Sequence, residues 1–178
     1  MKGSALARWR VRLGYPLGLA CLWLSEPSPE SLQIGCLVAV VGLLLRGWAA
    51  GHLRKQKALT TSGPYAYTRN PLYLGNVILA TGVAVAADAW PVAAIAAVYL
   101  AVFYPQAIWR EVEELRERYG EAFRAYAEKV PLFWPRFRPG LRDGASFSWA
   151  VYEENKEYRA VIGFLLVAAL LWLRMRYQ

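Results

Sequence analysis

Residues 63–75 read GPYAYTRNPLYLG, and an apolar run that ends at Ala87 follows directly. The segment holds two prolines, three tyrosines, one arginine and one asparagine. Proline suits the first turn of a helix and disfavours helical backbone in the residue before it, so we expect a helix that begins at Pro71 with Asn70 at its N-cap. A polar, aromatic segment at the start of an apolar helix is typical of an aromatic belt at a membrane surface or of a binding site. These residues alone leave both interpretations open.

The composition predicts a membrane protein. Of the 178 residues, 57% are hydrophobic and 19% are charged, whereas soluble domains carry about a quarter charged residues. The apolar residues form long blocks, as membrane-spanning helices do, and the length fits one domain. Cys21 and Cys36 lie in apolar blocks, which gives no indication of a disulfide or a metal site.

Apolar runs along the chain predict an all-α fold with about five transmembrane helices. The runs cover residues 13–24, 32–50, 72–87, 92–109 and 160–173. The first two runs are joined by the tight turn SEPSPES and look like a helical hairpin. We expect one domain, residues 1–178, composed of that hairpin (1–50), a core (51–139) and a surface segment with a last helix (140–178).

Lysine and arginine are distributed unevenly between the polar segments. The turns at residues 25–31 and near Asp88 contain acids and no base, and nearly all bases lie in residues 1–12, 51–71 and 110–159. The positive-inside rule then places the N-terminus and the GPYAYTRNPLYLG segment in the cytoplasm. Arg174 and Arg176 argue against a last run that spans fully. The net charge of +8 fits cytosolic loops and attraction to anionic lipid, and the chain lacks the patterns of nucleic-acid-binding proteins.

Residues 110–129 are highly charged and predict an amphipathic helix, because apolar side chains recur every three and four residues. Glu111 lies just beyond the last apolar residue of the fourth run, and a carboxylate at the membrane boundary is more often functional than one farther out. Leu115 and Arg118 follow four and seven residues later, on the same face of the helix as Glu111. A solvent-exposed helix with many ion pairs accounts well for the other glutamates and less well for Glu111. Residues 130–149 are rich in proline, glycine and aromatic residues, which predicts a loop.

Two further polar residues lie near the apolar runs. His52, the only histidine, makes neither a metal site nor a triad, and we expect it at the surface or the membrane interface. We expect Arg46 to extend its charge to the interface rather than to pair with a buried acid. The chain lacks G-x-G-x-x-G, P-loop, H-E-x-x-H and G-x-S-x-G motifs. A nucleotide-like cofactor would therefore bind in a non-Rossmann site, and no metal site is predicted.

Two motifs now identify a resemblance. GPYAYTRNPLYLG is followed, after one helical hairpin, by E-x-x-x-L-x-x-R-Y-G-x-x-F-x-x-Y-x-x-x-V-P. Together they make the chain similar to the isoprenylcysteine carboxyl methyltransferase family, which belongs to a wider group with the membrane phospholipid methyltransferases. The match runs from about Arg46 to Pro135. The resemblance implies an integral membrane enzyme that uses S-adenosylmethionine, held in a cytoplasm-facing pocket and released as S-adenosylhomocysteine.

The resemblance also implies the site residues. Glu111 and Arg118 take the catalytic roles, and the cofactor-binding positions are Lys57, Leu59, Tyr65, Arg69, Asn70, Tyr73 and Glu111. Two positions depart from the family pattern. Asn70 stands where histidine is commoner and cannot carry a charge, and Val112 stands where a second glutamate often occurs, which leaves the carboxylate role to Glu111.

The chemistry of the cofactor gives these residues a rationale. Arg69 suits its carboxylate, Glu111 suits its ammonium or sulfonium, and Tyr65 or Tyr73 suits its adenine or the sulfonium as a cation–π partner. A carboxylate acceptor is ionised at neutral pH and needs no general base, only a cation such as Arg118 to position it. A lipid amine would need a base, and Glu111 would have to serve.

The preferred hypothesis is therefore methyl transfer to the carboxylate of an isoprenylcysteine-like substrate that enters from the bilayer of a bacterial inner membrane. Phospholipid N-methylation is the alternative. A membrane reductase, with a nicotinamide cofactor clamped by Arg54, Lys55 and Lys57, and a non-enzymatic membrane scaffold are the other classes. The sequence does not give the acceptor, the oligomeric state or the role of residues 140–159.

Overall fold

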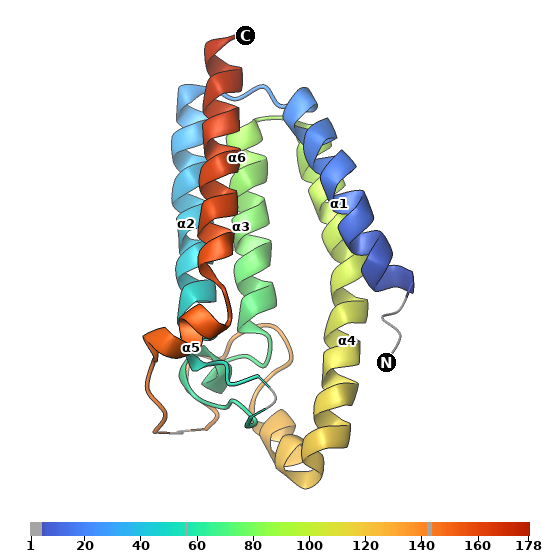
Figure 1. Cartoon of the computed structure of the whole chain (residues 1–178), viewed down its shortest axis with the longest axis vertical. Helices are drawn as coiled ribbons and strands as arrows, with labels where there is room; N and C mark the ends of the chain where they lie inside the picture. Colours follow the sequence, from blue (N-terminus) through green and yellow to red (C-terminus); the bar gives the residue numbers. More distant parts are fainter. Residues whose placement is uncertain (1–4, 56, 142–143) are drawn as a thin grey trace.

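A computed structural model describes the chain except residues 1–4, 56 and 142–143. The described residues form helices and no strand, which confirms the all-α membrane fold (Figure 1). The elements are α1 (Ala5–Leu24), α2 (Pro29–His52), the 3-10 helix η1 (Gly63–Ala66), α3 (Pro71–Ala87), α4 (Trp90–Lys129), α5 (Trp149–Glu154) and α6 (Tyr158–Arg176).

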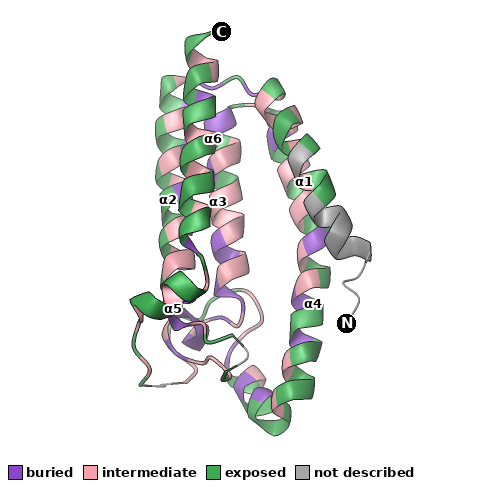
Figure 2. Cartoon of the chain, viewed as in Figure 1, coloured by how far each residue is buried: buried purple, intermediate pink, exposed green. Residues whose placement is uncertain are grey.

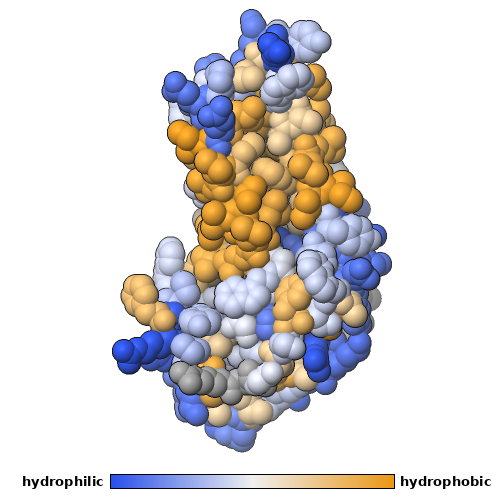
Figure 3. Space-filling model, turned by 90° about the vertical axis from the view of Figure 1, so that its left-hand side faces the viewer, coloured by the Kyte–Doolittle hydropathy of each residue, from blue (hydrophilic) through white to orange (hydrophobic). Residues whose placement is uncertain are grey.

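The apolar helices make the protein an integral membrane protein. Three of the described helices, α2, α4 and α6, are long and apolar enough to cross a membrane, and α3 is a shorter apolar helix of 17 residues. On the face that Figure 3 shows, an apolar belt lies between two hydrophilic ends. Figure 2 shows that much of the belt's helix surface is exposed, as expected where lipid rather than protein covers apolar side chains.

Small residues let α2 and α3 approach closely. A Cβ added to Gly35 would lie 2.4 Å from the Ala86 nitrogen, and one added to Gly82 would lie 2.4 Å from the Ala39 nitrogen. Membrane helices associate through such close backbone contacts, because lipid removes the hydrophobic driving force between them. Helices α2 and α3 are therefore tightly packed against each other.

The first two helices do not close into the expected hairpin. Helix α1 packs mainly against α4 and touches α6, whereas the main contacts of α2 are with α3, α5 and α6. In Figure 1, α1 lies beside α4, on the other side of the molecule from α2. The SEPSPES turn connects the two sides of the bundle, and its Glu26 N–H donates to the carbonyl of Ala87 at 2.8 Å.

The predicted charged helix is a continuation of α4 rather than a separate element. Helix α4 runs for 40 residues and reverses at Gly120, whose φ of 50° and ψ of −120° interrupt the helical backbone. The segment from 130 to 148 is irregular where described, as predicted, and α5 follows as a short helix. The long loops gather with these parts at one end of the bundle (Figure 1).

The last apolar run forms α6, with its C-terminal end at the opposite end of the molecule from the loops (Figure 1). Arg174 at this end has local partners, because its guanidinium donates to the carbonyls of Ser25 and Trp23 at 3.3 and 3.1 Å. The positive charge at this end is therefore used to fix α6 to the α1–α2 turn.

Candidate functional site

The GPYAYTRNPLYLG segment is held by the irregular chain that follows α4. The Arg69 N–H donates to the carbonyl of Pro131 at 2.9 Å, and the Gly140 N–H donates to that of Ala66 at 2.8 Å. The Thr68 hydroxyl donates to the carbonyl of Phe133 at 2.7 Å. These bonds run between segments more than sixty residues apart, so the two motifs are joined by backbone pairing rather than by side chains alone.

A tyrosine from the second motif completes this junction. The buried hydroxyl of Tyr126 donates to the carbonyl of Tyr65 at 2.8 Å. Tyr126 belongs to an apolar cluster with Ile108, Val112, Phe123 and Val130. The cluster packs the returning arm of α4 against its first arm, and the hydrogen bond fixes η1 to both.

A cavity of about 400 Å³ opens where the two motifs meet. Its walls come from the end of α2 and the following loop, from η1 and the start of α3, and from α4 on both sides of the Gly120 reversal. The lining residues are Leu53, Arg54, Lys55, Ala58, Leu59, Thr60, Tyr65, Arg69, Tyr73, Ala107, Arg110, Glu111, Glu114, Leu115, Arg118, Tyr119 and Tyr126. Six predicted site residues are among them, namely Leu59, Tyr65, Arg69, Tyr73, Glu111 and Arg118.

Glu111 is the carboxylate of the cavity nearest the membrane boundary. The protein around it raises the pKa of its carboxyl, mainly through desolvation and also through repulsion from Glu114. Lys55 and a hydrogen bond from the Tyr73 hydroxyl oppose this shift of the pKa. Glu111 nevertheless belongs to the exposed residues, and contact with solvent limits the size of the shift of its pKa.

Arg69 and Tyr65 lie deeper in the same wall. Burial lowers the pKa of the Arg69 guanidinium, and its Nε is a buried atom with no hydrogen-bond partner among the described residues. Burial raises the pKa of Tyr65 well above its usual value, and Glu111, Tyr126 and Glu157 add to the shift. Tyr65 is therefore a phenol at neutral pH, and the Arg69 side chain has a donor to offer a ligand.

Two predicted site residues lie outside the cavity lining. Lys57 is exposed, and its Nζ contacts the Glu154 carboxylate at 2.8 and 3.0 Å. Asn70 occupies the N-cap position of α3 as predicted, but its side chain makes no capping bond. Its Nδ2 instead donates to the carbonyl of Leu132 at 2.8 Å, so Asn70 helps to join the two motifs.

Of the two positions expected for His52, the surface or the membrane interface, the surface is wrong. His52 is buried, and its Nδ1 lies 3.1 Å from the Ser62 hydroxyl. Gly63 has a φ of 58°, and a Cβ there would lie 2.6 Å from the His52 ring. Only glycine accommodates both the left-handed backbone and the ring. The histidine thus fixes the start of η1.

The expectation that Arg46 reaches to the interface is also wrong. The Arg46 Nε contacts the Glu157 carboxylate at 2.6 Å, both side chains are largely buried, and a second guanidinium nitrogen bonds Asn76. A Cβ on Gly75 would lie 2.6 Å from the Arg46 Cγ. The last glycine of the GPYAYTRNPLYLG segment therefore gives the arginine room to reach Glu157, an acid that sequence spacing does not associate with it.

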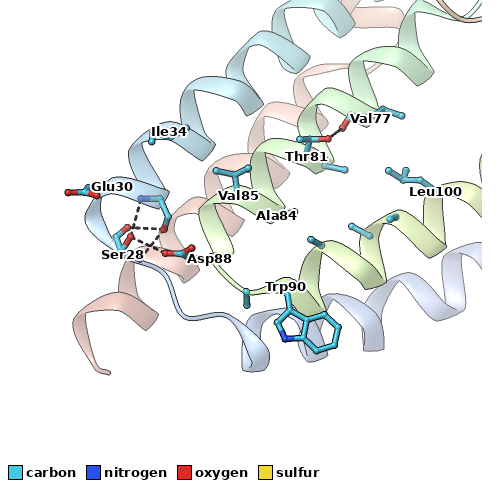
Figure 4. Close-up of a pocket in the computed structure, with 16 residues that line it drawn as sticks. Ser28, Glu30, Ile34, Val77, Thr81, Ala84, Val85, Asp88, Trp90 and Leu100 are labelled. Carbon is cyan, nitrogen blue, oxygen red and sulfur yellow. Dashed lines mark hydrogen bonds between the residues drawn. The ribbon is translucent and has the colours of Figure 1, made fainter.

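A larger cavity lies elsewhere and has a different character. It has a volume of about 820 Å³ and is lined mainly by alanine and valine from α2, α3 and α4 (Figure 4). Of its few polar groups, the Ser28 hydroxyl donates to Asp88 at 3.2 Å. The groove lies at the end of the bundle away from both motifs, so we assign the functional site to the smaller, charged cavity.

The lining also includes residues that the sequence prediction did not assign to the preferred site. Arg110, Glu114 and Tyr119 lie on the amphipathic stretch beside Glu111 and Arg118, and their helical spacing was the signal that could have found them. Arg54 and Lys55 were considered only for the reductase hypothesis. Tyr126 was part of the quoted motif pattern without an assigned role.

A comparison with protein families decides the family. The model for "Phospholipid methyltransferase" matches residues 31–122, slightly more than half of the chain. The chain belongs to the phospholipid methyltransferase family. This membership confirms the resemblance to the membrane methyltransferases and supports a methyltransferase in general terms.

Two curated relatives extend the comparison. The cobalt-zinc-cadmium resistance protein CzcN of Cupriavidus metallidurans is 35% identical over 127 residues, which are 70% of this chain and 57% of that protein. The nickel-cobalt-cadmium resistance protein NccN of Alcaligenes xylosoxydans xylosoxydans is 34% identical over 116 residues, which are 64% of this chain and 53% of that protein. The chain thus spans little more than half the length of these relatives. No solved structure matches it.

The names of the relatives mention metals, so metal-binding clusters are of interest. Within the described part of the chain, no group of three or more histidine, cysteine, aspartate or glutamate side chains is placed to hold a metal ion. The two cysteines are not joined in a disulfide.

Proposed function

We propose that this protein transfers the methyl group of S-adenosylmethionine to a lipophilic acceptor at the membrane. The observation that carries the proposal is the single cavity in which six predicted site residues from two distant motifs meet, beside the end of the apolar part of α4. The family membership supports the same class of reaction. The cofactor supplies an electrophilic methyl group, and the chain supplies its binding and positioning.

The residues of the cavity fit that cofactor. The buried Nε of Arg69 lacks a partner among the described side chains and suits a carboxylate. Glu111 suits an ammonium or sulfonium and accepts a hydrogen bond from the Tyr73 hydroxyl, and the protonated hydroxyl of Tyr65 can donate to a polar group of the ligand. Methyl transfer is an in-line displacement, so these residues act by orienting the reactants and excluding water.

The acceptor is proposed as a carboxylate of an isoprenylcysteine-like lipid, positioned by Arg118. That group is already ionised at neutral pH. A specific observation supports the second candidate, a phospholipid amine. The raised pKa of Glu111 makes it a better general base than an ordinary glutamate, because catalytic bases work best with a pKa near the operating pH.

The cavity is proposed to face the cytoplasm of a bacterium, with the helices in its inner membrane. The support is the concentration of lysine and arginine around the cavity end of the chain, which follows the positive-inside rule. The lipid chain of the acceptor would then remain in the bilayer while its polar group enters the cavity.

The first test is calorimetric titration of the detergent-purified protein with S-adenosylhomocysteine. We expect micromolar binding, weakened at least tenfold, or about 1.4 kcal/mol, by Glu111→Gln and by Arg69→Ala. Glu113→Gln and Arg138→Ala are matched controls at exposed positions outside the cavity and should bind like the parent. A monodisperse parent protein that does not bind would overturn the proposal, and nicotinamide cofactors would be titrated next.

A second measurement separates the two acceptors. Membrane lipids are incubated with the protein and S-adenosylmethionine carrying a radioactive methyl group, and the labelled products are treated with mild base. A methyl ester loses its label as methanol, whereas an N-methyl group keeps it. Retained label would overturn the carboxylate proposal in favour of the amine.

A further inference from the structure

A second charged cavity lies at the reversal of α4. It has a volume of about 530 Å³ and lies between the two arms of the helix, with Gly120 at its turn. Trp109 and Arg116 come from the first arm, and Phe123 and Arg124 come from the returning arm. A Cβ at Gly120 would meet no atom within 4 Å, so open space borders the turn.

Three arginines converge on this cavity, against one glutamate in its lining. Arg116 and Arg124 contact Glu113 and Glu121 at 3.2 and 2.9 Å, but all four side chains are more than half exposed. Exposed pairs of this kind contribute only about 0–1 kcal/mol, so both guanidinium groups can exchange their partners for a ligand.

The third arginine connects this cavity with the candidate cofactor site. Arg69 lines both cavities, and its guanidinium carbon lies 6.0 Å from the centre of the Phe123 ring. Its buried Nε has no partner in the described part of the chain. The second cavity thus contains an unused donor as well as two weakly engaged arginines.

The position of Trp109 places the cavity at the membrane boundary. Trp109 is the last residue of the apolar stretch of α4, it is 58% exposed, and the charged part of the helix begins at Arg110. Tryptophan is enriched at the level of lipid headgroups. The Trp109 side of the cavity therefore lies at the level of the lipid headgroups, within reach of their phosphates.

We propose that the Arg69–Arg116–Arg124 cavity binds the phosphate of a membrane lipid headgroup. Guanidinium groups present planar pairs of donors that match phosphate oxygens, and several of them around one cavity suit a group with several anionic oxygens better than a single carboxylate. The site goes beyond the proposed function, although both cavities include Arg69 in their lining. When the Arg69 Nε serves the carboxylate of S-adenosylmethionine, Arg116 and Arg124 hold the phosphate, so the site rests mainly on these two arginines.

The test uses the full chain in a neutral detergent and measures lipid binding by native mass spectrometry. The probes are phosphatidylglycerol, diacylglycerol, which lacks the phosphate, and inorganic phosphate. The variant is the double change Arg116→Gln and Arg124→Gln. Its control is the double change Arg138→Gln and Arg159→Gln, which removes the same charge from exposed positions outside the cavity.

We expect the parent to bind phosphatidylglycerol at least tenfold more tightly than diacylglycerol, and the Arg116/Arg124 variant to lose that preference. The control should stay within twofold of the parent. If both double variants lost the preference for phosphatidylglycerol equally, the preference would depend on net charge alone, which would overturn the site. Binding of inorganic phosphate at the same arginines without a preference for the lipid would overturn the lipid assignment.

Titration with S-adenosylhomocysteine separates this proposal from the methyltransferase proposal. The Arg116/Arg124 variant keeps Arg69 and should bind the nucleoside like the parent. A parent that binds phosphatidylglycerol but no S-adenosylhomocysteine would overturn the proposed function and leave the phosphate site standing. A parent that binds S-adenosylhomocysteine but shows no preference for phosphatidylglycerol would overturn the phosphate site and leave the proposed function standing.

Discussion

The membrane part and the loop end of this protein are stabilised in different ways. In the bundle, α2 and α3 bury glycine and alanine against each other and expose large apolar residues such as Leu37 and Leu44. At the loop end, the buried residues include Tyr126, Thr68 and Asn70, each with a hydrogen bond to a backbone carbonyl.

The difference follows from the surroundings of each region. Lipid is as apolar as leucine, so helices in it gain from close backbone contact rather than from burying large side chains. Water surrounds the loop end, where burying aromatic residues is favourable and buried polar groups need partners. The candidate site lies where the second kind of stabilisation begins, so its side chains are held by hydrogen bonds.

The largest expected effect comes from the helix contact in the bundle. Gly82→Leu would place side-chain atoms against the Ala39 nitrogen and the Gly35 carbonyl. Overpacking usually costs about 1–3 kcal/mol, and more is expected where backbone atoms must move. We expect most of the monodisperse protein to be lost on size-exclusion chromatography. Gly163→Leu, on the exposed surface of α6 with nothing near its Cβ, is the control, and equal yields would contradict the tight contact.

The Arg46–Glu157 pair links the two regions and should have the next largest effect. Glu157→Gln leaves the largely buried guanidinium without its anion, and breaking a buried pair costs roughly 3–5 kcal/mol. A lower melting temperature in detergent would record this. Replacing both residues by methionine should recover much of the loss. Glu113→Gln breaks an exposed pair and should cost less than about 1 kcal/mol, so similar losses in the two single variants would argue against the buried pair.

A smaller effect is expected where the motifs meet. Tyr126→Phe removes the donor to the buried carbonyl of Tyr65, which should cost about 1–3 kcal/mol. The melting temperature measures the loss, and Tyr152→Phe on the half-buried tyrosine of α5 is the control. A melting temperature unchanged by Tyr126→Phe would show that backbone pairing alone joins the two motifs.

The smallest effect concerns Glu111. Its replacement should leave the stability of the fold unchanged or raise it slightly, whereas the three changes above lower it. Its pKa is raised in the folded state from the usual 4.5, so the folded protein binds more protons than the unfolded chain between pH 4.5 and the raised pKa. Stability is therefore lost as pH rises through that window. Glu111→Gln should abolish that loss and melt at an equal or slightly higher temperature at neutral pH. A clear decrease relative to Glu113→Gln would instead assign Glu111 a stabilising role.

Much of the fold could be predicted from the chain. The apolar runs predicted the helices, because length and hydropathy alone decide which segments suit a bilayer. Pro71 predicted the start of α3, since proline fits a first helical turn. The stripe of Glu111, Leu115 and Arg118 predicted residues that line one cavity. These are local properties, which sequence spacing records.

The errors have a common physical cause. Arg46 and His52 were assigned from their own neighbourhoods, but their partners are Glu157 and Ser62. Asn70 takes the predicted N-cap position, but its side chain also has a partner that the sequence did not indicate, the carbonyl of Leu132. Two of these partners lie more than sixty residues away. A polar side chain next to an apolar run gives no sign of whether water or a distant residue will satisfy it.

The sequence by itself determined the membrane class, the apolar parts of the helices, the start of α3 and the family motifs, because hydrophobic blocks, prolines and spacing act locally. Only the tertiary structure decided that α1 packs beside α4, that Arg46 pairs with Glu157, and that α4 reverses at Gly120 to form two cavities. Those outcomes depend on which surfaces approach each other in space, and such contacts leave no periodic pattern along the chain.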